Sequence, residues 1–141
     1  MAINFFTEDI DFELPQKLKH KNWLKELAKT EGYKILELNY IFCSDEYLFQ
    51  INVEYLNHDD YTDIITFDNS EDEKTIEGDI FISIDRVKEN ATKLDQDFNK
   101  ELNRVISHGA LHLMGYKDKS ESESKKMRLM EDLAITLYEK L

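Results

Sequence analysis

The chain has 141 residues, 41% of them hydrophobic and 34% charged. This length is enough to bury the core of one domain, over residues 1–141, without disulfide support. Its formal charge of −12 argues against broad, unspecific binding of nucleic acid. The single cysteine, Cys43, excludes an intrachain disulfide and a multi-cysteine zinc site. No apolar run has membrane-spanning length and the acidic N-terminus is unlike a signal peptide, so we expect a cytoplasmic protein with no membrane partner.

The first part of the chain predicts strands interrupted by two helices. Strands are expected over Ile3–Phe6 and Lys34–Phe42, and a helix from Pro15 to about Thr30 between them. Ser44 is a good cap for a second helix. The two clearest strands are Asp63–Phe67 and Asp79–Ile84, and the acidic loop between them indicates a hairpin-like connection.

The chain from Asp85 onward is predicted to be helical, over about 85–96, 99–114 and 121–140. Ser120 and Glu123 form a capping box for the last helix. Strands first and helices later, without regular alternation, predict an α+β fold in which helices pack against a small mixed sheet.

The most informative pattern lies in the C-terminal half, where His108, His112, Gly115 and Asp118 have the spacing H-x-x-x-H-x-x-G-x-x-D. Two histidines four residues apart share one face of a helix. Gly115 can end that helix in the left-handed conformation, and Asp118 can then return to the same metal ion. Three protein ligands with one free position are typical of a hydrolytic zinc site.

Other interpretations of this pattern remain open. A lone His-x-x-x-His pair also occurs as packed, hydrogen-bonded histidines, and Asp118 could be a solvated loop carboxylate. The spacing also matches metzincin peptidases, but their catalytic glutamate is replaced by Gly109. The ligand set makes one Zn²⁺ our first choice. Because a carboxylate ligand shifts the preference modestly toward harder metals, other divalent transition metals are also acceptable.

Three blocks of the sequence resemble the bacterial YbeY family of metal-dependent endoribonucleases, which are implicated in ribosomal RNA maturation. The family signature His-Gly-x-Leu-His-Leu-x-Gly-Tyr-Asp-His is similar to residues 108–118. A second block, Asn-x-x-Tyr with Thr-Asp-Val-Leu-Ser-Phe, resembles residues 52–55 and 62–67. A third, beginning Gly-Asp-Ile, resembles residues 78–83. Order and spacing agree from about residue 45 to the end.

The resemblance implies that His108 and His112 bind zinc, with position 118 as the third ligand. Asp118 stands where relatives have histidine; a shifted register would put Lys119 there, but a charged lysine cannot bind metal. It further implies a zinc-dependent, single-strand-specific endoribonuclease in rRNA processing, with metal-activated water attacking a phosphodiester. Thr62, Asp63, Gly78 and Asp79 match family positions, and we interpret them as strand ends and turns that hold the site.

One departure concerns catalysis, because Leu56 replaces an arginine that usually follows the Asn-x-x-Tyr block. Arg104, Lys117 or Lys119 could supply the missing cation, but we assign no catalytic residue beyond the metal site. The alternative function is a non-catalytic, metal-stabilised factor that associates with the ribosome. In both cases the expected partners are single-stranded RNA or rRNA and the ribosome or a basic ribosomal protein.

Overall fold

The computed structural model describes residues 2–141, and its elements follow the sequence-based order closely. In chain order they are β1 (Ala2–Thr7), α1 (Lys17–Thr30), β2 (Lys34–Cys43), α2 (Asp45–Leu56), β3 (Ile64–Asp68), β4 (Thr75–Ser83), α3 (Ile84–Lys93), α4 (Phe98–Leu113) and α5 (Glu121–Lys140). Ser44 caps α2 by accepting a hydrogen bond from the Tyr47 N–H, and the capping box of Ser120 and Glu123 opens α5. These local signals are confirmed.

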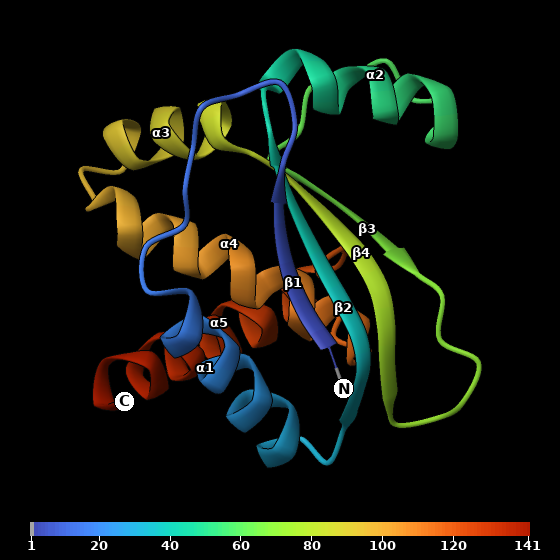
Figure 1. Cartoon of the computed structure of the whole chain (residues 1–141), viewed down its shortest axis with the longest axis vertical. Helices are drawn as coiled ribbons and strands as arrows, with labels where there is room; N and C mark the ends of the chain where they lie inside the picture. Colours follow the sequence, from blue (N-terminus) through green and yellow to red (C-terminus); the bar gives the residue numbers. More distant parts are fainter. Residues whose placement is uncertain (1) are drawn as a thin grey trace.

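The sheet is mixed, as predicted, and has the strand order β1-β2-β4-β3. β1, β2 and β4 are parallel, whereas β3 is an antiparallel edge strand joined to β4 as a hairpin. Figure 1 shows α1, α4 and α5 together on one side of the sheet, with α2 and α3 near one end of it. Because β3 has a neighbour on one side only, its other edge is free to border a cavity.

The main core lies between the sheet and α4, whose buried stripe includes Leu102, Val105, Ile106 and Leu113, as predicted. Tyr40 of β2 donates a hydrogen bond from its hydroxyl to the Ile106 carbonyl at 2.8 Å, which ties the helix to the sheet. A smaller cluster of Cys43, Leu48 and Ile65 packs α2 against the sheet. The α+β class and the helix-covered mixed sheet are therefore confirmed. No helix within residues 2–141 is both long and apolar enough to cross a membrane.

Several boundaries differ from the sequence-based prediction, most strand ends by one residue and the end of α3, at Lys93 instead of about residue 96, by three. Helix α1 begins at Lys17 rather than Pro15, because Gln16 has a left-handed backbone with φ 52° that a helix cannot continue through. Strand β4 begins at Thr75 rather than Asp79, because its first residues pair with Lys34 and Ile35 of β2, although β3 pairs with β4 only from Gly78 onward. Pairing with a strand distant in sequence extends β4 beyond what local alternation indicates.

Cys43 gives a direct test of this core. The thiol is fully buried, and burial together with the nearby carboxylate of Asp9 raises its pKa to about 12. We expect no reaction with a thiol reagent such as DTNB at pH 8 in the native state, since the protonated thiol is a weak nucleophile. One equivalent should react after unfolding in guanidinium chloride; rapid labelling of the native protein would contradict the burial.

Candidate metal centre

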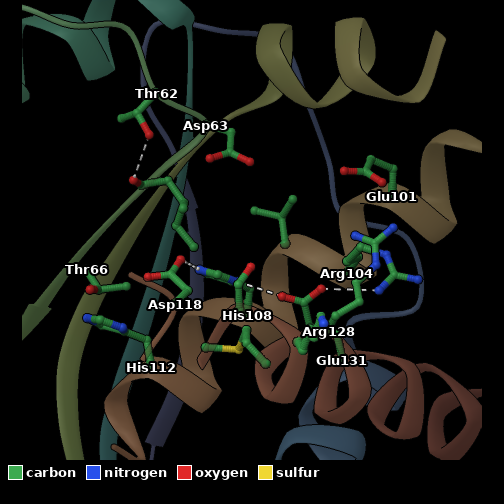
Figure 2. Close-up of a pocket in the computed structure, with 15 residues that line it drawn as sticks. Thr62, Asp63, Thr66, Glu101, Arg104, His108, His112, Asp118, Arg128 and Glu131 are labelled. Carbon is green, nitrogen blue, oxygen red and sulfur yellow. Dashed lines mark hydrogen bonds and ion pairs between the residues drawn. The ribbon is translucent and has the colours of Figure 1, made fainter. Parts of the chain in front are cut away.

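Helix α4 places His108 and His112 on the wall of a cavity of about 770 Å³. The cavity lies between the edge strand β3 and helices α4 and α5 (Figure 2). The His108 side chain is 23% exposed, whereas His112 lies closer to the surface. Their neighbours Val105, Ile106 and Leu113 are buried in the core, so the helix is anchored while both imidazoles face the cavity.

Gly109 faces the sheet rather than the cavity. A Cβ at this position would lie 3.0 Å from side-chain carbons of Ile64 and Ile80, closer than ordinary van der Waals contact. The missing side chain therefore lets α4 pack closely against β3 and β4. The position that holds the catalytic glutamate of metzincins is here part of the packing, which argues against a peptidase of that type.

The turn after α4 brings Asp118 back to the cavity, as the sequence predicts. Gly115 has φ 97°, its N–H bonds to the His112 carbonyl at 3.0 Å, and the Tyr116 N–H bonds to the Leu111 carbonyl at 3.1 Å. These two bonds form a Schellman motif, which a glycine at this position permits. Tyr33, which lies directly before β2, donates a hydrogen bond from its hydroxyl to the Met114 carbonyl at 2.6 Å and so ties the turn to the rest of the fold.

Asp118 and Glu131 contact the two ring nitrogens of His108 (Figure 2). The Nε2 atom lies 3.2 Å from Asp118 Oδ2, and Nδ1 donates a hydrogen bond to Glu131 Oε2 at 2.7 Å. Glu131 also accepts from Arg104 at 3.2 Å, while Asp132 lies 2.8 Å from the same guanidinium. Glu131 is thus a buried carboxylate that orients one proposed ligand and is itself held by a cation.

Sequence reasoning missed Glu131, although a signal was available. It follows Met127 and Met130 and precedes Ala134 on the buried stripe of α5, so a carboxylate interrupts an apolar helix face. A charge in such a position needs a buried partner. Which partner it meets depends on the packing of α5 against α4, and no local pattern contains that information.

The charges of the cavity alter several pKa values. Burial lowers the pKa of His108, but the hydrogen bond and charge of Glu131, with the charges of Asp118 and Asp63, outweigh it, so the pKa is raised. Burial raises the pKa of Asp63, and burial likewise raises that of Glu101. The cavity therefore concentrates carboxylates around one imidazole, which is an environment that favours a bound cation.

The donor chemistry of this cavity fits a divalent metal ion. When Nδ1–H of a neutral His108 donates to Glu131, the lone pair of Nε2 faces the Asp118 carboxylate. These two acceptors avoid repulsion by sharing a positive charge, which is either a proton, as the raised pKa favours in metal-free protein, or a metal ion. Their separation of 3.2 Å is close to the spacing of about 3.3 Å between two ligand atoms, each about 2.0–2.1 Å from a tetrahedral ion. Imidazole and carboxylate are both ordinary zinc ligands.

The third proposed ligand, His112, lines the same cavity one helical turn after His108 (Figure 2). Within residues 2–141, no three His, Cys, Asp or Glu side chains already converge as a complete metal site. The pair of His108 and Asp118 is in place, and the three-ligand centre stays a prediction.

The other residues singled out from the sequence divide into two groups. Thr62 and Asp63 line the cavity, whereas Gly78 and Asp79 do not. A Cβ on Gly78 would collide with the Phe67 carbonyl of β3, and Asp79 accepts a hydrogen bond from Asn39 of β2 at 3.0 Å, so both hold the sheet. Gly78 and Asp79 are therefore structural residues, but they lie in the middle of β4 and not at a strand end or turn. Thr62 and Asp63 do lie directly before a strand, β3, and they also line the cavity.

The candidate cations also divide. Arg104 lines the cavity but is paired with Glu131 and Asp132, and neither Lys117 nor Lys119 belongs to the lining. Helix α5 contributes Lys125 and Arg128 instead. Arg128 forms no ion pair within 4 Å among residues 2–141, so its guanidinium is available to an anion.

Comparison with known proteins places this geometry in a family. A family model described as Endoribonuclease YbeY matches residues 3–139. A Cytophaga hutchinsonii protein named Endoribonuclease YbeY is 58% identical over 136 residues, covering 96% of this chain and 95% of that protein. A Christiangramia forsetii protein of the same name is 48% identical, covering 96% and 94%. A solution structure of a Thermotoga maritima protein is 27% identical with a TM-score of 0.68, covering 97% of this chain and 89% of that one.

The match spans nearly the whole chain, including the strands and helices that precede the three sequence blocks. Each alignment covers nearly all of this chain and nearly all of the relative, so the similarity is not confined to the helix with the two histidines. The chain belongs to the Endoribonuclease YbeY family.

Proposed function

We propose that this protein is a zinc-dependent, single-strand-specific endoribonuclease that acts in rRNA processing. The observation that carries the proposal is the pair of His108 and Asp118, held by Glu131 in a cavity of about 770 Å³, in a chain whose relatives are named endoribonucleases. His108, His112 and Asp118 would hold the divalent metal ion, which would supply Lewis-acid chemistry for the attack of water on the phosphodiester.

The residues around the metal ligands act by position and charge. Glu131 keeps the Nδ1 proton of His108 in place, which leaves Nε2 free as a ligand atom. Arg104 balances the buried charge of Glu131, and because Asp132 also holds it, Arg104 is a positioning residue rather than the phosphate ligand considered from the sequence. We assign phosphate binding to Arg128 and Lys125, which line the cavity on the α5 side.

The overall charge supports a local rather than an extended contact with RNA. A net charge of −12 disfavours a long phosphate track, while two cations at one rim suit a short single strand. The same acidic surface is complementary to a basic ribosomal protein, which is the partner we propose for delivery to rRNA.

The central prediction concerns RNA cleavage. Zinc-loaded protein should cleave a single-stranded RNA, chelation should abolish cleavage, and zinc should restore it. His112→Ala should lower the cleavage rate at least about a hundredfold, since a catalytic metal contributes several kcal/mol of transition-state stabilisation. Cleavage is followed by gel electrophoresis of an end-labelled strand. Tight zinc binding without any RNA cleavage would favour the non-catalytic, ribosome-associated alternative.

A second prediction tests the ligand set directly. Asp118→Ala should lose most of its zinc in native mass spectrometry, because a site with two histidines alone holds zinc weakly. Asp72→Ala, which removes a carboxylate from the loop between β3 and β4 outside the cavity, should keep a full equivalent. Equal zinc content in both variants would refute the three-ligand centre.

A third prediction concerns the role of Glu131. In metal-free protein the pKa of His108 is raised, so the pair stabilises the fold fully below about pH 6.5 and loses this contribution as the pH rises through the raised pKa. Glu131→Gln should lower the His108 pKa, because the main stabilising charge is gone while burial remains. An NMR titration of the imidazole measures it.

Asp132→Asn is the matched control for this titration, since Asp132 contacts Arg104 but not His108. It should leave the His108 pKa nearly unchanged. A similar decrease in both variants would show that the general negative charge of α5, and not the contact with Glu131, raises the pKa.

A further inference from the structure

A second cavity, of about 410 Å³, opens beside the metal cavity and has no role in the proposed chemistry. It lies between α2, the segment before β3 and β3 itself, and is lined by Asn52, Leu56, His58, Asp60, Tyr61, Thr62, Ile64, Ile65 and Thr66. Thr62, Ile64 and Thr66 also line the first cavity. The two cavities are therefore neighbours along the edge strand, and a ligand that crosses these shared residues reaches both.

The wall formed by the segment before β3 is held in place by a single buried amide. Asn52 is 4% exposed. Its backbone carbonyl accepts a hydrogen bond from the His58 N–H at 3.2 Å, and its side-chain amide donates one to the Asp60 backbone carbonyl at 2.8 Å. Asn57 ends α2 in the left-handed conformation with φ 56°, which turns the chain back toward Asn52 just before these two contacts. The segment is preorganised, which lowers the entropy cost of binding a ligand.

Tyr61 forms a second rigid part of this wall. Its ring stacks on that of Phe49, with the ring centroids 4.4 Å apart. The guanidinium of Arg86, a residue of α3, lies 5.6 Å from the centroid of the Tyr61 ring. Its hydroxyl donates to Glu46 at 3.2 Å. Although Tyr61 is 50% exposed, these three contacts give its ring a defined place in the wall of the cavity.

The two cavities differ in their cations. Arg104, Lys125 and Arg128 line the first, beside the carboxylates of Asp63, Glu101, Asp118 and Glu131, whereas the lining of the second holds no Lys or Arg and one carboxylate, Asp60. A phosphate therefore finds cationic partners in the first cavity and none in the lining of the second. The second offers instead apolar surface from Leu56 and Ile65 and uncharged hydrogen-bonding groups from Thr62 and Thr66. That combination matches an unstacked nucleobase, which presents apolar faces and a polar edge.

We propose that the second cavity binds the base of the nucleotide next to the phosphate held in the first, so that the substrate strand crosses β3 with its backbone in one cavity and one base in the other. This inference rests on the proposed function for its substrate class. Leu56 contributes the apolar surface against which the base lies, and His58 contributes a ring nitrogen at its edge.

The test is a thermodynamic cycle between a cavity residue and a base, measured by fluorescence anisotropy. The ligands are a non-cleavable 2′-O-methyl RNA heptamer and seven versions, each with one abasic nucleotide. For the wild-type protein at least one abasic position should weaken binding about tenfold, as expected for loss of one stacked base. Leu56→Trp, which fills the cavity, should weaken binding of the intact heptamer by a similar factor. This variant should then bind that abasic heptamer no more weakly than it binds the intact one.

Val53→Trp is the matched control, because Val53 lies on the same helix and is 38% exposed against 39% for Leu56, but does not line the cavity. It should bind all heptamers like the wild type. His58→Ala supplies a second cycle with the same expectation if the tryptophan lowers the melting temperature. The inference would be overturned if the losses of binding caused by base removal and by Leu56→Trp simply add. It would also be overturned if no abasic heptamer binds the wild-type protein more weakly than the intact one.

The outcome also separates this inference from the proposed function. Coupling between Leu56 and one base without RNA cleavage would refute the nuclease activity and leave the base site standing. Cleavage of RNA by zinc-loaded protein without that coupling would refute the base site alone.

Discussion

The hydrogen bond between His108 and Glu131 is the contact on which the site depends, because it joins the two helices that enclose the cavity. Glu131 lies on the buried stripe of α5, and its charge is tolerated there only because the imidazole and Arg104 share it. The same bond selects the histidine tautomer that turns Nε2 toward Asp118. The packing of α5 on α4 therefore also fixes the orientation of His108, so a change that separates the two helices also releases this proposed metal ligand.

The close approach of α4 to the sheet is the second requirement. Gly109 lets the helix lie against Ile64 and Ile80, which brings the histidines beside the edge strand β3. Because β3 has only one neighbour, Thr62 and Thr66 remain free to line both cavities. A central strand at this position would have been covered on both edges, and the metal cavity would have had no continuation toward α2.

The division of charge between the cavities gives the proposed substrate a direction. Cations of α5 line the cavity that holds His108 and Asp118, whereas the recess beside α2 is lined by no cation. Electrostatic attraction fixes a phosphate without regard to sequence, whereas a shaped recess responds to the base. With Leu56 in that recess, the α2 side contributes apolar surface where relatives are expected to carry a cation, so the cationic contribution in this chain falls to α5.

Periodicity, caps and turn residues were enough to predict nearly all helices and strands, because amphipathic spacing, Ser44, the capping box at Ser120 and the left-handed Gly115 act within one or two turns of chain. The spacing of His108, His112 and Asp118 likewise indicated a shared site before any fold was known. Tertiary structure alone decided that Glu131 would orient His108, that Arg104 would be occupied by carboxylates, and that α2 would form a second cavity beside the first. These contacts join residues separated by tens of positions, and their partners are chosen by how helices pack on a sheet, which no local pattern encodes.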